Sequence, residues 1–261
     1  MVDKKIIESQ SLVIDVFRGF RDELLAAFGN IEHDLKSDQS QVTQLDIKIE
    51  ETLKSRLAKA YPEFGFQGEE TGKSGNSKQF WLVDPIDGTS SFIRGMPACT
   101  NMAAFVDGNQ SVISVIYDFI HDILYTAIKG GGAFKNQVKM QVDNNRAPNN
   151  LYVYLTDTSR LFELRGIFKS LGMRCFSPFG ASGHFYILLS EGKIDGCTMV
   201  NPRCGVHDNA PGVLLATEAG CQVIQLDDKD GIYMHEFIIG SPNFIAAISD
   251  KTADLKSLFS H

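Results

Sequence analysis

This sequence has no long hydrophobic segment. It contains only short apolar runs, such as Phe185–Leu189 and Phe244–Ile248, whereas a membrane-spanning helix needs about 20 apolar residues. Charged residues follow Met1 and do not lead into the apolar core of a signal peptide. We therefore expect a protein with no membrane partner and no secretion signal.

Cysteine is also scarce. The five cysteines stand at positions 99, 175, 197, 204 and 221, and no two of them form a C-x-x-C pair. An odd count in a chain of this length argues against a disulfide framework, so we expect reduced thiols and a cytoplasmic location. One alternative stays open, because Cys204, His207 and Asp208 lie close enough in sequence for zinc, although a structural zinc site needs a second close pair of ligands.

A basic surplus is missing as well. The chain has 25 Lys and Arg against 32 Asp and Glu, for a net charge of -7, which argues against nucleic acid as a partner. Neither G-x-G-x-x-G after a strand nor G-x-x-x-x-G-K-[ST] occurs, which argues against a nucleotide cofactor. The excess of acids has two explanations, solubility or a cluster that holds metal cations.

The remaining pattern is that of a layered α/β protein with mixed α+β layers and antiparallel hairpins. The polar stretch 141–150 predicts a boundary between an N-terminal half, 1–145, and a C-terminal half, 146–261. Apolar spacing predicts helices over 6–28, 43–61 (with Thr43 and Asp46 as a capping box), 160–171, 184–191 and 209–219. Asp208 is expected as the N-cap of the last helix, with Pro211 in its first turn. Strands are expected over 80–83, 102–106, 111–117, 123–128, 151–155, 221–226 and 237–241.

Two carboxylates follow the strand expected at 80–83. Asp84 ends that strand, and Asp87 stands three residues later in a tight turn that can open a helix. Together with an unpaired Ile86 carbonyl, they would suit Mg²⁺. Gly88 lets the backbone approach a ligand closely, and the amides of residues 88–90 would hold a phosphate at the helix start. The alternative is a plain turn with side-chain caps.

Three other acids are ambiguous when each is taken alone. Glu69 and Glu70 stand in a glycine-flanked loop, where acids are usually solvated, and Asp208 is explained by helix capping. Their joint occurrence with the turn at 84–89 is more informative than any one of them.

These segments together resemble the inositol monophosphatase family. Gly-Glu-Glu at 68–70, WLVDPIDGT at 81–89 and DNAPG at 208–212 resemble its three signatures, and they occur in the family order. VTQLD at 42–46, KGGGAF at 129–134 and Gly-Ala-Ser at 180–182 are similar to further family segments. The likeness covers about residues 36–245, nearly the whole chain.

The resemblance implies a five-layer αβαβα sandwich, usually a homodimer, that hydrolyses phosphate monoesters with two or three Mg²⁺ ions and is often inhibited by Li⁺. Glu69, Asp84 and the Ile86 carbonyl would hold one ion. Asp84, Asp87 and Asp208 would hold a second, and Glu70 would help to place a third through water. Thr89, oriented by Asp46, would position and deprotonate the attacking water together with Glu69.

The substrate side departs from the family pattern. His207 replaces the usual Trp of the last signature, and Met199 stands where inositol-selective members carry a Glu, beside a short insertion up to Arg203. His207 is expected as a core or rim residue, and Arg203 either contacts a second anionic group or is a solvated surface residue. By resemblance, the substrate and phosphate contacts would be Asp87, Gly88, Thr89, Ser90, Ala181, Met199 and Arg203.

The leading hypothesis is a Mg²⁺-dependent phosphomonoesterase acting on a small phosphorylated polyol, similar to inositol monophosphatase. Within the same family, the alternatives are a 3′(2′),5′-bisphosphate nucleotidase, a fructose-1,6-bisphosphatase and a histidinol-phosphatase. A rival of another class is a regulatory binding protein on the phosphatase fold, motivated by His207 and the altered substrate loop.

Overall fold

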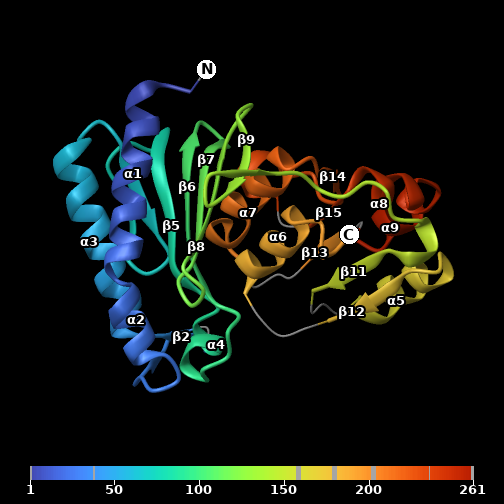
Figure 1. Cartoon of the computed structure of the whole chain (residues 1–261), viewed down its shortest axis with the longest axis horizontal. Helices are drawn as coiled ribbons and strands as arrows, with labels where there is room; N and C mark the ends of the chain where they lie inside the picture. The colour runs from blue at the N-terminus through green and yellow to red at the C-terminus, as the bar shows by residue number, and fades with distance from the viewer. Residues whose placement is uncertain are drawn as a thin grey trace.

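The chain folds into five layers that alternate helices and sheets. The computed structural model describes residues 2–37, 39–156, 160–177, 181–200, 204–234 and 236–259. Three helices cover one side of an eight-stranded sheet, two helices separate it from a five-stranded sheet, and further helices cover the far side (Figure 1). The αβαβα sandwich expected from the sequence is confirmed.

The outer helical layer consists of α1 (Lys4–Gly19), α2 (Arg21–Ala27) and α3 (Gln44–Ala60). The single helix expected over 6–28 is divided into α1 and α2 at Phe20. Next to this break, the Arg21 guanidinium donates to the Phe119 carbonyl at 2.9 Å. In α3 the predicted capping box of Thr43 and Asp46 is present.

The eight-stranded sheet has the order β10-β9-β8-β7-β6-β5-β3-β4. All neighbours are antiparallel except β3 and β5, and the three strands expected at 102–128 are confirmed. The bounds are β3 (Gly65–Gly68), β4 (Gly72–Ser74), β5 (Gln79–Asp87), β6 (Thr100–Asp107), β7 (Gln110–Asp118), β8 (Ile123–Ile128), β9 (Gly132–Lys135) and β10 (Val138–Met140).

Strand β5 is longer than predicted. It continues past Val83 to Asp87, with a shift of register against β6 between Asp84 and Asp87. This irregularity accommodates Pro85, which has no N–H to give to a ladder. The segment between the two aspartates is thereby freed from regular pairing.

The alternation of side chains along β5 explains where its acids point. Trp81 and Val83 belong to the apolar core beneath α1 and α3, whereas Leu82 packs with Ala210 of the next helical layer. Since successive strand residues face opposite sides of a sheet, Asp84 shares the face of Leu82. It therefore lies toward the middle helices.

The middle layer consists of α6 (Ser182–Ser190) and α7 (Val206–Glu218). Both helices begin earlier than predicted, by two and three residues. Asp208 is consequently the third residue of α7 and not its N-cap, which is Gly205, and Pro211 lies inside the helix and not in its first turn. The Asp208 carboxylate accepts from the Gly205 N–H at 2.5 Å and so stabilises the extra turn.

The second sheet has the order β12-β11-β13-β15-β14, parallel around β11 and antiparallel around β15. Its bounds are β11 (Tyr152–Leu155), β12 (Arg174–Phe176), β13 (Gly196–Met199), β14 (Gln222–Gln225) and β15 (Phe237–Gly240). Helices α5 (Leu161–Ser170), α8 (Pro242–Ala247) and α9 (Thr252–Ser257) share an apolar core with its outer face. The strands and the helix expected in these regions are confirmed.

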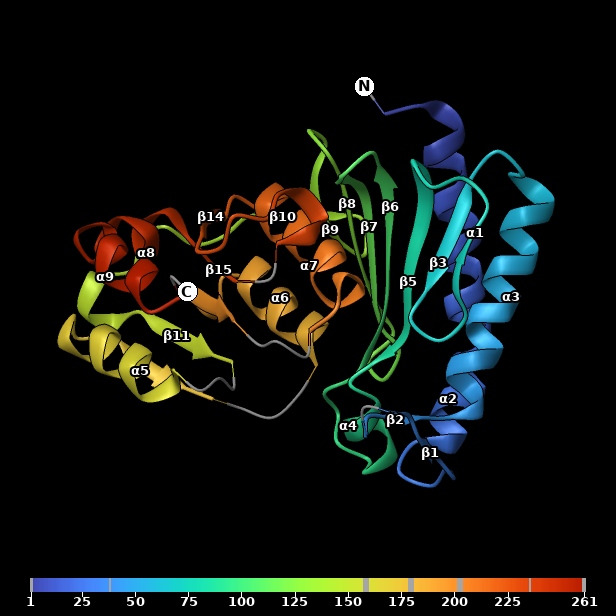
Figure 2. The ribbon, with the colours of Figure 1, turned by 180° about the vertical axis from the view of Figure 1, so that it is seen from behind.

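Short elements surround the end of β5. Figure 2 shows β1 (Asp34–Leu35), β2 (Gln41–Val42) and α4 (Thr89–Ile93) together there. Three 3₁₀ turns complete the fold, at Pro148–Asn150, Gly231–Tyr233 and Ser249–Lys251. None of the helices among the described residues combines the length and apolar character needed to cross a bilayer.

Candidate metal centre

Three elements bring acidic side chains to one place. Strand β3 runs parallel to β5, with Gly68 opposite Val83, so the carboxyl ends of both strands meet at the same edge of the sheet. Glu69 follows β3, and its N–H donates to the Val83 carbonyl at 3.1 Å. Asp84 follows in β5, and the first turns of α7 place Asp208 across from it.

Two groups of side chains have the geometry to hold metal ions. Glu69, Asp84 and His207 form one, and Asp84, Asp87 and Asp208 form the other; within each group the ligand atoms lie within 4.8 Å of one another. Asp84 belongs to both. Cys204 belongs to neither, so within the described residues no group corresponds to the zinc interpretation.

Burial makes this cluster strongly electrostatic. Desolvation raises the pKa of Asp84 well above its usual 3.8, and the nearby Glu69 and Asp87 raise it further. Burial likewise raises the pKa of Asp87 and of Asp208 to about 7, with Asp208 acting on Asp87 and Glu69 acting on Asp208. Without a cation, part of the cluster therefore keeps its protons at neutral pH.

The residues fit a divalent metal. Asp84 is only 2% exposed, yet its Oδ1 atom is buried without a hydrogen-bond partner. A buried carboxylate oxygen in this condition is costly unless a cation compensates it. Oxygen donors from several carboxylates are those that Mg²⁺ prefers.

Lys36 supplies a cation that the sequence did not reveal. Its ammonium group lies 2.6 Å from Glu69 and 2.5 Å from Glu70. Burial lowers the pKa of Lys36, but the hydrogen bonds to both glutamates outweigh this and hold it above its usual value. No local pattern identifies such a residue, because Lys36 and Glu69 are 33 residues apart in sequence.

Asp87 is fixed by the start of α6. Its carboxylate accepts from the N–H groups of Ser182 at 3.0 Å and Gly183 at 2.7 Å, and from the Thr100 hydroxyl at 3.1 Å. A Cβ atom at Gly183 would lie 2.4 Å from the Thr100 hydroxyl, so only glycine fits there. The Gly-Ala-Ser segment was noted in the sequence, but Gly183 and Thr100 were missed.

The expected link between Thr89 and Asp46 is not present in this structure. The Thr89 hydroxyl donates to the Ile86 carbonyl at 3.0 Å. The Asp46 carboxylate accepts from the backbone N–H of Thr43 at 2.8 Å and from its hydroxyl at 2.6 Å. The helix cap thus occupies Asp46, while burial raises its pKa to about 7.

Gly88 and Ser90 also have protein partners. Gly88 has φ of +84° and would place a Cβ 2.7 Å from both Ala181 and the Ala98 carbonyl oxygen. The Ser90 hydroxyl donates to Gln41 at 2.7 Å. In this structure, the lack of a side chain at Gly88 therefore allows the turn to pack closely against Ala181 and Ala98.

A cavity of about 770 Å³ opens beside the acids. Glu69, Asp87 and Asp208 line one part of it, together with residues 88–90 of the turn. The other part is mainly apolar, lined by Tyr154, Leu155, Leu161, Ala181, Phe185 and Met199. Arg203 and Gly180 lie outside the described residues.

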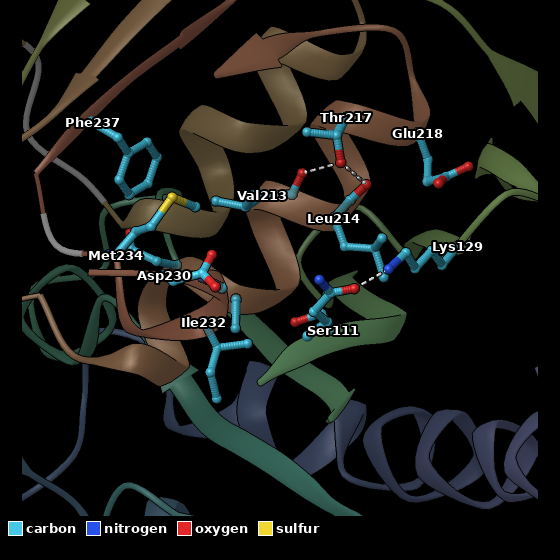
Figure 3. Close-up of a pocket in the computed structure, with 14 residues that line it drawn as sticks. Ser111, Lys129, Val213, Leu214, Thr217, Glu218, Asp230, Ile232, Met234 and Phe237 are labelled. Atoms are coloured by element: carbon cyan, nitrogen blue, oxygen red, sulfur yellow. Dashed lines mark hydrogen bonds between the residues drawn. The ribbon is translucent and has the colours of Figure 1, made fainter. Parts of the chain in front are cut away.

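A second cavity of about 300 Å³ lies further along α7 (Figure 3). Val213, Leu214 and Thr217 line it from that helix, and the Thr217 hydroxyl donates to the Val213 carbonyl at 2.8 Å. It contains neither of the two metal-ligand groups, whereas Glu69, Asp87 and Asp208 line the cavity of about 770 Å³.

A five-layer αβαβα sandwich with buried acids at the edge of its larger sheet defines a class of metal-dependent phosphatases. A model of the inositol monophosphatase family matches residues 10–257. The chain therefore belongs to the inositol monophosphatase family and is a phosphoric monoester hydrolase.

Individual relatives agree with this assignment. A Nus factor SuhB from Xylella fastidiosa is 36% identical over 207 residues, covering 77% of this chain and 74% of that protein. An inositol-1-monophosphatase from Mesorhizobium japonicum is 32% identical over 216 residues, covering 76% and 77%. The solved structure of an IMPase from Thermotoga maritima shares the fold, with a TM-score of 0.80 at 20% identity, over 96% of this chain and 97% of that chain.

Proposed function

We propose that this protein is a Mg²⁺-dependent phosphomonoesterase of small phosphorylated substrates. The observation that carries the proposal is the buried, unpartnered Oδ1 atom of Asp84, a residue that belongs to both groups of potential ligands. No neighbouring protein group donates a hydrogen bond to this oxygen. A pair of cations bound on either side of it would satisfy it.

Glu69, Asp84, Asp87 and Asp208 are taken from these groups, and the Ile86 carbonyl and Glu70 are added from the family resemblance. Glu69, Asp84 and the Ile86 carbonyl hold one ion, and Asp84, Asp87 and Asp208 hold the other. Glu70 places a third ion through water. When bound, such ions lower the pKa of a water molecule and neutralise charge that develops on the phosphate oxygens.

Thr89 and Glu69 would hold the attacking water, and the Glu69 carboxylate would take its proton. In the described structure Thr89 donates to the Ile86 carbonyl, which is itself one of the proposed ligands. With a cation held at that carbonyl, the Thr89 hydroxyl would be available to Asp46, as the family resemblance implies. The amides of Gly88, Thr89 and Ser90 then bind the phosphate oxygens at the start of α4.

The substrate alcohol lies in the apolar part of the cavity, near Ala181 and Met199, with Arg203 as a further contact. The polyol phosphate remains the leading substrate class, because a relative at 32% identity is named an inositol-1-monophosphatase. A second candidate is a phosphate ester with a planar apolar group, such as a nucleotide bisphosphate. Tyr154, Phe185 and Met199 line the wall that such a group would face.

Phosphate release from a substrate panel tests the proposal. The panel contains inositol 1-phosphate, a nucleoside 3′,5′-bisphosphate, fructose 1,6-bisphosphate and histidinol phosphate, each with and without Mg²⁺. We expect Mg²⁺-dependent turnover of at least one of them. Absence of turnover on all four while Mg²⁺ is bound would contradict the proposal, and a preference for the bisphosphate would favour the planar class.

Several properties of the whole protein remain predictions. We infer a homodimer, a cytoplasmic location and inhibition by Li⁺ from the family, and a division into halves at residue 145 from composition. Light scattering of the purified protein tests the dimer, and limited proteolysis near 141–150 tests the division. Inhibition of phosphate release by millimolar Li⁺ tests the third property.

A further inference from the structure

His207 lies against two acids of the cluster. Its Nε2 atom is 3.6 Å from Glu69 Oε2 and 3.5 Å from Asp208 Oδ2, and the side chain is only 20% exposed. Together with Glu69 and Asp84 it forms one of the two groups whose ligand atoms lie within 4.8 Å of one another. The imidazole is therefore within reach of whatever cation those carboxylates hold.

The ring is also held in place from below. A Cβ atom at Gly205 would lie 2.5 Å from His207 Cε1 and 2.9 Å from Nε2. Gly205 has φ of -82°, which any residue adopts. Glycine at this position is therefore explained by the space that the His207 ring occupies, and not by the backbone conformation.

The third observation concerns a carboxylate oxygen that a bound cation would satisfy. Asp84 is only 2% exposed, and its Oδ1 atom is buried without a hydrogen-bond partner. This orphan points to a ligand that the acids alone do not supply. The adjacent imidazole nitrogen adds a donor of different chemistry to the same group.

We propose that His207 is a direct nitrogen ligand of the ion held by Glu69 and Asp84, and that it makes this position select a borderline transition metal such as Co²⁺ or Zn²⁺ over Mg²⁺. The proposal rests on the proposed function, because it concerns the same metal centre. Imidazole suits Zn²⁺ and its neighbours, whereas carboxylates and carbonyls suit Mg²⁺. The group of Asp84, Asp87 and Asp208 contains only oxygen donors and keeps the preference for Mg²⁺.

Metal binding to the full chain tests this without turnover. Metal-free protein is titrated with Co²⁺ and with Mg²⁺ by calorimetry, and the Co²⁺ form is examined by absorption and by proton NMR. We expect a solvent-exchangeable ring N–H resonance shifted by the paramagnetic ion. Replacing His207 by Gln should abolish this resonance. It should also weaken Co²⁺ binding about tenfold or more, because loss of even an outer contact of a metal site lowers metal affinity about 10- to 100-fold. The Mg²⁺ affinity should be nearly unchanged.

Two variants sharpen the result. His121→Gln removes a histidine that pairs with Asp118 away from the site, and should change neither titration. Gly205→Ala displaces the His207 ring and should reduce Co²⁺ affinity, while combining it with His207→Gln should give no further loss, as expected for residues acting through one contact.

Some outcomes would overturn the inference. These are a wild-type Co²⁺ form without the shifted resonance, or equal losses of Co²⁺ and Mg²⁺ affinity in His207→Gln. The proposed function fails separately, by the absence of phosphate release from a wild-type protein that binds metal.

Discussion

The chemistry of single residues in this protein is dominated by carboxylates that burial prevents from ionising freely. Asp208 lies opposite Asp87 and next to Glu69, and each raises the free energy of charging its neighbour. Lys36 offsets only part of this charge, through Glu69 and Glu70. Among these acids, Asp84 has a buried oxygen, Oδ1, that no protein donor contacts, and a divalent cation could bind it.

Asp208→Asn removes one ligand and one of these charges. We expect the rate of phosphate release to fall about 100-fold or more, because a direct ligand is worth at least as much as an outer contact of a metal site. The fold should persist, since Asn can still accept from the Gly205 N–H. Calorimetry of Mg²⁺ binding alongside the activity assay checks this. Asp250→Asn, at an exposed site, is the control, and full activity of Asp208→Asn would refute the ligand assignment.

Thr89→Ala separates proton transfer from metal binding. We expect kcat to fall by about 10²- to 10⁴-fold, the usual contribution of a positioned acid–base group, with Mg²⁺ affinity little changed. Thr89→Ser keeps the hydroxyl and should retain most of the rate. Steady-state kinetics of both variants provide the measurement, and equal activity of Thr89→Ala and wild type would exclude Thr89 from the reaction.

At the scale of secondary structure, the site depends on one irregularity in β5 and on the turn that follows it. The register shifts between Asp84 and Asp87, the Ile86 carbonyl accepts from the Thr89 hydroxyl, and Gly88 then turns the chain into α4 with positive φ. The turn is packed directly against Ala181 at the start of α6. Two elements that are distant in sequence therefore fix the same loop.

Gly88→Ala tests this packing. The added methyl group would lie 2.7 Å from Ala181 Cβ and from the Ala98 carbonyl oxygen. We therefore expect the free energy of unfolding to fall by about 1–3 kcal/mol, in line with other strained positions. We also expect the rate of phosphate release to fall. Gly108→Ala has a similar positive φ of +66° but nothing within 4 Å. Urea unfolding of both variants isolates the clash, and similar destabilisation by the two would mean that backbone strain alone matters.

The sequence predicted elements well where one local pattern decides them. The capping box of Thr43 and Asp46 and the hairpin at 102–117 are of this kind. The break at Phe20 could not be predicted, because the apolar spacing continues through it and the neighbouring Arg21 contacts Phe119, which is 98 residues away in sequence. The strand at Gly196–Met199 was missed since it is short and contains little periodicity.

The candidate site shows the same division. Its acids stand in recognisable segments, so their presence was predictable. Their partners were not, because Lys36, Thr100 and Gly183 reach the acids only through tertiary contacts. The start of α7 was misjudged for a related reason, since a helix that continues through Pro211 is stabilised by its packing between the sheets.

At the scale of the molecule, the metal centre lies where the two sheets are joined by the middle helices. The core between the sheets combines residues of both halves, including Met102 and Ile116 of the first sheet and Met199 and Ile239 of the second. Glu69, Asp84 and Asp208 therefore meet only when the layers are assembled. The cost of bringing their charges together is part of the folding free energy.

This cost predicts an unusual dependence of stability on pH. The pKa of Asp46, Asp87 and Asp208 is raised from 3.8 to about 7 by burial, so between these values the folded protein binds more protons than the unfolded chain. By linkage, the contribution of these groups to the unfolding free energy falls as pH rises from about 4 to 7. The metal-free protein should therefore lose stability across this range.

Mg²⁺ should reverse that loss, because it binds the ionised carboxylates and displaces their protons. We expect saturating Mg²⁺ to raise Tm more at pH 8 than at pH 5.5, by several degrees, given that 1 kcal/mol corresponds to about 2–4 °C for a chain of roughly this size. Calorimetry with EDTA or Mg²⁺ at both pH values measures the difference, and subtracting the two conditions cancels acids far from the site. Asp208→Asn should shrink it, and an Mg²⁺ effect equal at both pH values would show that the cluster is already ionised without metal.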